Sequence, residues 1–217
     1  LLHWDAILKK IIFDDDMAKN MLDYIIMLYD AAIRTIDQAI YYFLKKLEGM
    51  NFLNNTVLVI TSDHGEEFLE HGAYGHMGKR YCTHMYEELL RVPLVIIDFT
   101  DKLQTKLFKK LRDLEWSHAD LYPTLCGFMK FATPSETDGY NLLRIIEVKN
   151  NKQRSIISEA SLFGYMRGVI RIPPNEKIVI AIKKGRWKYI NYNNVLEELY
   201  NIERDPREKS NLIFKCE

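Results

Sequence analysis

Apolar residues recur every three or four positions along the first quarter of the chain. This spacing places them on one face of a helix, and the set comprises Tyr24, Ile25, Leu28, Tyr29, Ala32, Ile33, Ile36, Ile40, Phe43, Leu44 and Leu47. Carboxylates at positions 14–16 precede the stretch, where they can cap a helix and face the positive end of its dipole, and Gly49 follows it. The pattern predicts an amphipathic helix of about eight turns, with its aromatic residues in the core.

Two short apolar runs, at 56–61 and 92–97, come next along the chain. Both are continuous rather than alternating, which is typical of strands buried on both faces of a parallel sheet. A helical segment at 86–90 precedes the second run. A strand, a crossover and a second strand together predict an α/β fold.

The pattern changes after about residue 145. A helix is predicted from Ser117 to Phe131, and short strands are predicted at 155–158, 177–182 and 187–190. We therefore expect a partial α/β core over residues 1–145, with a mostly parallel sheet flanked by helices. A small α+β subdomain with an antiparallel sheet is expected over residues 146–217, its last strand packing on a C-terminal helix.

The net charge and the lengths of the apolar runs bear on whether the protein binds nucleic acid or crosses a membrane. The 217 residues carry 30 Lys and Arg against 30 Asp and Glu, so the formal net charge is zero. This balance argues against nucleic-acid binding through bulk positive charge. The apolar runs are a few residues long, which predicts no membrane segment, and the chain begins with Leu1, as if entered in mid-sequence. The compartment and the oligomeric state stay open.

The three cysteines, Cys82, Cys126 and Cys216, are odd in number and widely spaced. They match neither a disulfide framework nor a CxxC metal pair. We expect buried free thiols.

The strongest chemical signal follows the first predicted strand. Asp63 and His64 stand at its carboxyl end, where α/β sheets bind ligands. An oxygen donor beside a nitrogen donor suits a divalent metal ion, and Gly65 lets the backbone turn sharply after them. The alternative is a capped turn that carries a surface histidine.

Histidines are concentrated in the loop that follows. Four of the six histidines fall between positions 64 and 84, namely His64, His71, His76 and His84. Lys79 and Arg80 lie among them. A cationic side chain here can hold a sulfate or phosphate oxygen or protonate a leaving group, because histidine titrates near neutrality.

Five segments resemble, in order and at fitting spacing, the sulfatases of the alkaline phosphatase superfamily. They read YDAAIRTID (29–37), SDHGEEFLEHG (62–72), YEELLRVPL (86–94), DLYPTL (120–125) and ELYNIERDP (198–206). The resemblance covers the chain from about residue 20 onward.

The resemblance implies roles for individual residues. Asp63 and His64 match the family's second pair of metal ligands. Sulfatases commonly bind calcium there, whereas related phosphonate and phosphodiester hydrolases often use manganese or zinc. His76 falls where the family has a Lys or His that contacts the ester near its leaving-group oxygen, with Lys79 as a nearby substitute. Glu66 and His71 are expected to shape the loop or to lie just behind the residues that contact the ligand.

Two family elements do not occur in this sequence. The chain has no Cys/Ser-x-Pro/Ala-x-Arg motif, from which sulfatases make a formylglycine nucleophile, and no match to the family's first pair of Asp ligands. The resemblance thus implies the C-terminal portion of a metal-dependent sulfuric ester hydrolase, inactive alone, whose parent acts on a small-molecule or glycan sulfate ester. The alternatives are a phosphonate monoester or phosphodiester hydrolase of the same superfamily, and a non-enzymatic fragment with a structural or binding role.

Overall fold

The computed structural model describes residues 15–76, 84–100, 110–112, 114–132, 136–147, 154–161, 178–192 and 196–213. Of the residues singled out above, Lys79, Arg80, Cys82 and Cys216 lie outside this part of the chain. Cys126 lies within it and is a buried free thiol, as expected.

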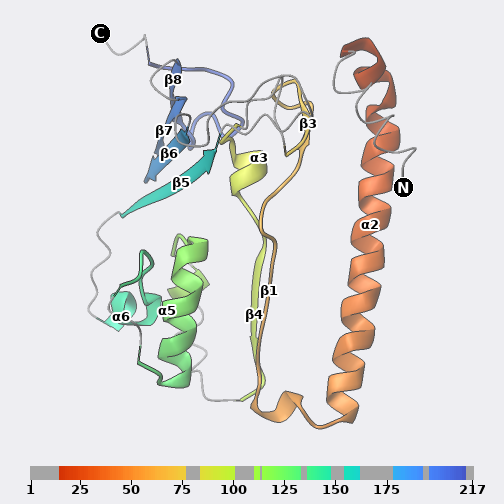
Figure 1. Cartoon of the computed structure of the whole chain (residues 1–217), viewed down its shortest axis with the longest axis vertical. Helices are drawn as coiled ribbons and strands as arrows, with labels where there is room; N and C mark the ends of the chain where they lie inside the picture. Colours follow the sequence, from red (N-terminus) through yellow and green to blue (C-terminus); the bar gives the residue numbers. More distant parts are fainter. Residues whose placement is uncertain are drawn as a thin grey trace.

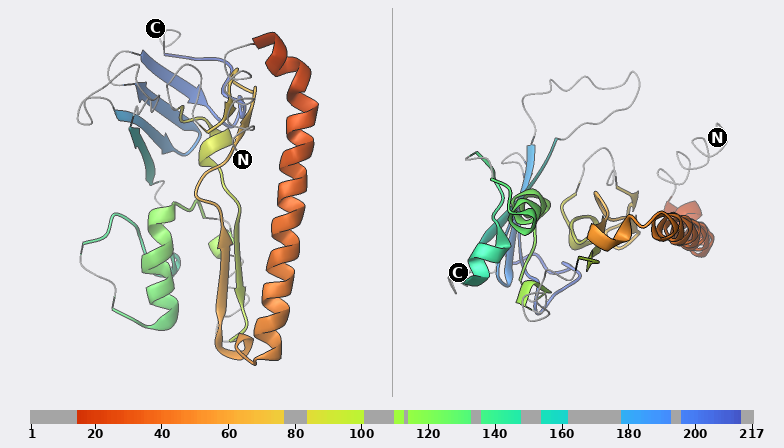
Figure 2. Two further views of the ribbon diagram at one scale, coloured as in Figure 1. Left: turned by 45° about the vertical axis from the view of Figure 1, so that its right-hand side comes forward. Right: turned by 90° about the horizontal axis from the view of Figure 1, so that it is seen from below.

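The predicted long helix is confirmed as α2 (Asp15–Gly49), which lies along one side of the molecule (Figures 1 and 2). Its N-terminal end packs against the segment after the first strand, where Met21 and Ile25 contact the buried Tyr74. The expected burial of its aromatic residues is wrong for the described structure, since Tyr42 is 70% and Phe43 is 55% exposed. Within the described part of the chain, this face of the helix is therefore largely open to solvent, although Ile40, Leu44 and Leu47 are partly buried.

The next two predicted strands are β1 (Val57–Thr61) and β4 (Leu94–Asp98), and they pair with each other. The pairing is antiparallel, from Val57 opposite Asp98 to Thr61 opposite Leu94, and the parallel arrangement predicted for them is wrong. The chain leaves β1 and re-enters β4 at the same end of the pair, after an excursion that includes β2 (Glu67–Phe68), β3 (Tyr74–Gly75) and the single turn α3 (Glu87–Leu90). A parallel pair would instead require a crossover to the opposite end.

The sheet formed by β1 and β4 has two strands among the described residues. Burial on both faces was expected, but β1 is partly exposed and Val95 of β4 is 45% exposed. Burial of both strand faces requires a layer on each side of the sheet, and the described elements do not supply both.

The C-terminal antiparallel sheet is confirmed. Its strands are β5 (Ser155–Ser161), β6 (Ile178–Lys184), β7 (Trp187–Tyr192) and β8 (Leu196–Asn201), in that spatial order (Figure 1). The segment expected to meet a C-terminal helix pairs with β8 instead, because Glu198 and Tyr200 alternate inward with the period of a strand. From residue 154 onward the described residues form strands and turns, and helices are not found among them.

Two short helices lie between the two sheets in sequence, α5 (His118–Met129) and α6 (Leu142–Glu147). Ser117 caps α5 in a capping box with Asp120, as its position in the sequence allows. Asp120 also pairs with Arg154 at the start of β5, which ties α5 to the C-terminal sheet. The described chain contains both helices and sheets, which confirms the α/β class predicted from the sequence. The helix α6 runs across the domain boundary that the sequence analysis placed at residue 145.

Among the described residues, no helix combines the length and the apolar character that crossing a membrane requires.

Candidate functional site

Asp63 and His64 lie at the bend where β1 ends. The next residue, Gly65, donates its backbone N–H to the carbonyl oxygen of Leu89 at 2.8 Å. A Cβ at position 65 would come within 1.9 Å of the carbonyl oxygen of Glu88, so the bend can press against α3 only because it has no side chain. This contact fixes the position from which Asp63 and His64 project.

The two side chains fit the role of paired ligands for one cation. Asp63 Oδ1 lies 3.8 Å from His64 Nε2, a separation that one ion at about 2.0–2.6 Å from each donor can bridge. His64 Nδ1 donates to the carbonyl oxygen of Gly65 at 2.8 Å, which leaves the lone pair on Nε2. The His64 imidazole and the His64 backbone N–H lower the pKa of Asp63, so its carboxylate is ionised at neutral pH.

The structure brings His76 to the same place. His76 follows β3 in a small hairpin with β2, and its ring centroid lies 4.2 Å from that of His64. About half of the His76 side chain is exposed, so a ligand can reach it from solvent. The predicted Asp63–His64–His76 grouping thus occurs, while the predicted contribution of Lys79 lies outside the described residues.

Glu66 lies beside His76 in this site, and the resemblance implied that it either shapes the loop or lies just behind the contacting residues. Its Oε2 lies 3.5 Å from His76 Nδ1, and one donor atom from each of His64, Glu66 and His76 lies within 4.8 Å of the other two. The only feature of the sequence that could have indicated this position is the spacing of two residues between His64 and Glu66. That spacing does not show that the chain turns back and brings His76 beside Glu66.

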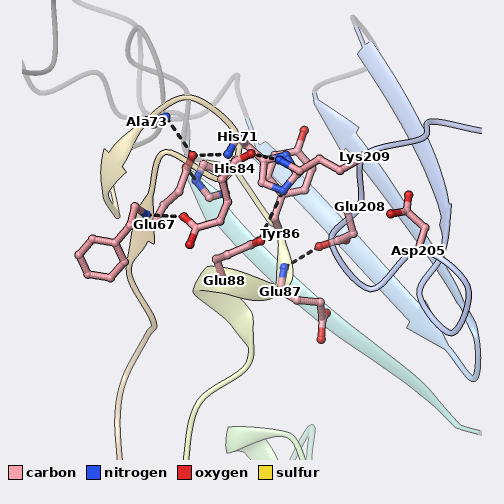
Figure 3. A network of polar contacts seen from close by, with 12 residues as sticks. Glu67, His71, Ala73, His84, Tyr86, Glu87, Glu88, Asp205, Glu208 and Lys209 are labelled. Atoms are coloured by element: carbon pink, nitrogen blue, oxygen red, sulfur yellow. Dashed lines mark hydrogen bonds and ion pairs between the residues drawn. The ribbon is translucent and has the colours of Figure 1, made fainter. Parts of the chain in front are cut away.

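A buried carboxylate holds the hairpin that carries His76 (Figure 3). Glu67 is fully buried, accepts the backbone N–H groups of His71 at 2.6 Å and Ala73 at 2.9 Å, and pairs with the His84 ring. Burial raises the pKa of Glu67, but His84 and these N–H groups outweigh it and bring the pKa below its usual value. An ionised, multiply bonded Glu67 therefore fixes the loop from within.

His71 connects the same hairpin to the C-terminal sheet. Its ring stacks on Tyr86 with centroids 3.5 Å apart, and its Nε2 lies 3.5 Å from Glu88 Oε2. Tyr86 in turn donates to Glu198 of β8 at 3.1 Å. Burial, and then the Lys209 charge, lower the pKa of His71 to about 4, so the ring is neutral at physiological pH. The histidine-rich segment therefore divides into two structural residues, His71 and His84, and two site residues.

Solved structures share this architecture over most of the chain. One is a protein in complex with its substrate D-glucosamine-2-N,6-O-disulfate, with 25% identity, a TM-score of 0.60, and coverage of 85% of this chain and 35% of that one. Another is the phosphonate monoester hydrolase of Agrobacterium radiobacter, with 20% identity, a TM-score of 0.64, and coverage of 85% and 36%, a likeness that shows the fold alone. The fold is that of the alkaline phosphatase superfamily.

Sequence comparison identifies the family within this superfamily. The family model described as Sulfatase matches residues 9–131, and the model described as N-sulphoglucosamine sulphohydrolase, C-terminal, matches residues 72–217. The chain belongs to the sulfatase family. It is also similar to an arylsulfatase of Clostridium perfringens, with 29% identity over 188 residues, which make up 85% of this chain and 35% of the relative. The chain spans about a third of the length of the relatives it matches.

Proposed function

We propose that this chain is the C-terminal portion of a metal-dependent sulfuric ester hydrolase. The observation that carries the proposal is the placement of the His64 and His76 rings 4.2 Å apart, beside Asp63, at the end of β1. A carboxylate beside imidazole nitrogens is a donor set that suits a divalent cation. The share of each relative that the chain covers supports its status as a portion of a longer enzyme.

Asp63 and His64 are the proposed ligands of one divalent cation, with calcium first and manganese or zinc as the alternatives. When bound, the cation supplies positive charge that polarises the ester and favours an ionised nucleophile. Asp63 contributes a carboxylate that is ionised at neutral pH, and His64 contributes the nitrogen left with a lone pair by the Nδ1 bond to Gly65.

His76 is the proposed proton donor to the departing alcohol. Its ring is half exposed and stands beside His64, so it is accessible to a ligand that binds at the Asp63–His64 pair. A histidine can donate a proton near neutral pH, which lowers the barrier for poor leaving groups. Lys79, three residues further on, is proposed to bind the non-bridging oxygens.

The nucleophile is proposed to come from a part of the enzyme outside this chain. The sequence holds no Cys/Ser-x-Pro/Ala-x-Arg motif, and the family resemblance implies a formylglycine made from such a motif. We therefore expect the 217 residues alone to be inactive toward aryl sulfates.

The proposed substrate class is a sulfated small molecule or glycan. The disulfated glucosamine in one related structure and the description of the C-terminal family model both support it. A phosphonate monoester or phosphodiester is the second candidate. Matched aryl sulfate and aryl phosphonate substrates separate the two, because a preference for the phosphonate would contradict the sulfatase proposal.

The test uses the complete enzyme. Asp63→Ala should reduce kcat for an aryl sulfate by at least roughly 100-fold, because it removes a ligand of the polarising cation. Glu203→Ala, which removes an exposed carboxylate in the turn after β8, is the matched control and should retain normal kcat. Near-normal turnover by the Asp63 variant would reject the metal assignment.

The role of His76 has a separate signature. His76→Ala should lower kcat most for esters with poor leaving groups, because those need the proton most. His118→Ala removes an exposed histidine at the start of α5 and serves as the control. Equal losses across the leaving-group series would show that His76 is not a proton donor.

A further inference from the structure

A tight turn after β8 directs the carboxylate of Glu208 into the interior. The turn is built by Asp205, whose backbone carbonyl accepts the N–H of Glu208 at 3.1 Å and whose carboxylate accepts the N–H of Ser210 at 2.8 Å. Glu208 has a φ of +51°, a left-handed conformation that is uncommon for residues other than glycine. Its side chain is fully buried. A buried charge in a strained backbone conformation indicates a specific partner inside the molecule.

The partner is the first residue of α3. Glu208 Oε2 accepts the backbone N–H of Glu87 at 2.7 Å, a contact between residues 121 positions apart (Figure 3). α3 comprises four residues, and within the described chain Tyr86, the residue before it, provides no side-chain cap. An uncapped single turn is marginally stable, because its first N–H groups have no acceptor within the helix. Glu208 therefore supplies the cap that the local sequence lacks.

Lys188 holds this cap in place. Its Nζ lies 2.7 Å from Glu208 Oε1 and 3.0 Å from Glu87 Oε1. The Glu208 oxygen that pairs with Lys188 is therefore not the oxygen that accepts the Glu87 N–H. The ion pair and the cap are two separate contacts of one carboxylate, and substitutions can remove them independently.

The other end of α3 holds the bend after β1. The carbonyl of Leu89 accepts the N–H of Gly65, which directly follows the Asp63–His64 pair, at 2.8 Å. The carbonyl of Glu88 occupies the space that a Cβ of Gly65 would fill. Glu87 and Leu89 are two residues apart, which corresponds to about 3 Å along a helix axis. A displacement at the capped end of α3 therefore reaches the bend directly.

We propose that Glu208 is a positioning residue for the Asp63–His64 pair and acts through α3 and Gly65. The cap fixes the start of α3, α3 fixes Gly65, and Gly65 fixes the backbone from which both side chains project. The functional consequence rests on the proposed function: where the pair binds its cation, loss of the cap displaces the two donors and weakens binding. The positioning itself requires neither a cation nor turnover, so it can be tested separately.

The test compares two variants of the complete enzyme that differ only at position 208. Lys188→Met with Glu208→Gln keeps a side-chain oxygen for the Glu87 N–H, whereas Lys188→Met with Glu208→Met removes it. Both lack the buried ammonium, and Glu87 keeps Lys183 at 3.7 Å, so neither variant leaves a buried charge unpaired. Replacement of a buried ion pair by side chains of similar volume is often tolerated, so both variants should fold, and circular dichroism verifies it.

Hydrogen–deuterium exchange, resolved to single amides by mass spectrometry with electron-transfer fragmentation, reports the bend. The Gly65 amide should exchange at least about tenfold faster in the variant without the acceptor, because α3 no longer holds the bend. The Phe99 amide, which bonds to the Thr56 carbonyl at the far end of the β1–β4 pair, is the internal control and should exchange equally in both variants.

Isothermal titration of the metal-free enzyme with Ca²⁺ measures the consequence for the site. The variant without the acceptor should bind Ca²⁺ about tenfold more weakly than the variant that keeps it. Glu203→Ala, which removes an exposed carboxylate in the same turn region, should keep the parent affinity. A purely stabilising role of Glu208 would lower the free energy of unfolding without separating the two Ca²⁺ affinities.

Equal exchange of Gly65 in the two variants would overturn the proposal. Faster exchange of Gly65 and Phe99 alike would also overturn it, because the acceptor would then stabilise the fold as a whole. Equal Ca²⁺ affinity despite a faster Gly65 amide would reject the role toward the ligand pair. Ca²⁺ binding that survives Asp63→Ala, or its absence from the parent enzyme, counts against the proposed function only, and the exchange of Gly65 then still decides the positioning role.

Discussion

Lys188 lies fully buried in β7, between two carboxylates. Its Nζ is 3.0 Å from Glu87 Oε1 and 2.7 Å from Glu208 Oε1. Glu208 also accepts the backbone N–H of Glu87 at 2.7 Å, at the start of α3. Burial raises the pKa of Glu208 despite the ammonium beside it, so this group depends on Lys188 to remain ionised. The triad joins the loop after the functional site to the C-terminal sheet.

Lys188→Ala is expected to lower the free energy of unfolding by about 3 kcal/mol or more, because it leaves the buried Glu208 carboxylate without its ammonium partner. Lys184→Ala, which removes an exposed lysine from the neighbouring strand β6, should change it by less than about 0.5 kcal/mol. Urea unfolding at pH 7 measures both. A loss as small as that of the control would show that the triad does not stabilise the fold.

The buried His71 predicts a specific pH dependence. Because its pKa falls from 6.5 to about 4 in the folded chain, the unfolded state takes up a proton more readily between these values. Stability is therefore complete above about pH 6.5 and is lost as the pH falls toward and through 4, by up to roughly 3 kcal/mol for this group.

The experiment compares urea unfolding at pH 7 and pH 5 in the parent chain and in His71→Asn. The variant should lose less stability between the two pH values, because it cannot be protonated. His118→Ala should behave like the parent chain. An identical pH response of parent and His71→Asn would exclude His71 as the source.

At the scale of elements, the end of β1 and the turn α3 are placed by a backbone contact. Gly65 donates to Leu89, and Gly65 lies directly against the carbonyl of Glu88. The hairpin of β2 and β3 is held through Glu67, so the position of His76 depends on a carboxylate nine residues earlier. The site is therefore built by packing between short elements.

Gly65→Ala should separate β1 from α3, since its Cβ would meet the Glu88 oxygen at 1.9 Å. We expect a loss of about 2 kcal/mol or more in unfolding free energy. Gly49→Ala, at the end of α2, meets nothing within 4 Å and should be neutral or slightly stabilising. Similar effects of the two substitutions would show that the close approach at Gly65 is not required.

At the scale of the whole molecule, apolar surface is exposed along α2 and on β4. Ile33 is 50% exposed, Ile36 is 59% exposed and Val95 is 45% exposed. Apolar side chains that recur on one exposed helix face are typical of a surface that packs against another part of a protein. This agrees with the proposal that the chain is one portion of a longer enzyme.

The purified chain is expected to self-associate at micromolar concentrations through this surface. Sedimentation velocity measures the association, and a chain carrying both Ile33→Glu and Ile36→Glu should associate more weakly, because charge disfavours burial of that face. Replacing the exposed Lys45 and Lys46 by Glu provides a control at the charged end of the same helix. Equal association of all three chains would show that this face of α2 does not mediate it.

The sequence by itself determined the local elements and the type of chemistry. The periodicity from Tyr24 to Leu47 predicted α2, the β-branched run predicted β1, and the Asp63–His64 pair at its end indicated the site. These features depend on neighbouring residues, so a linear pattern contains them. The family motifs extended the same logic to His76.

Only the tertiary structure decided how these pieces meet. The antiparallel pairing of β1 with β4 depends on where a long excursion returns, which no local pattern encodes. The approach of Glu66 to His76 depends on a hairpin closed by a buried Glu67, and the pairing of β7 with β8 replaced an expected helix. Strand partners, buried charges and donor clusters are set by contacts between distant residues, and those contacts exist only in the folded chain.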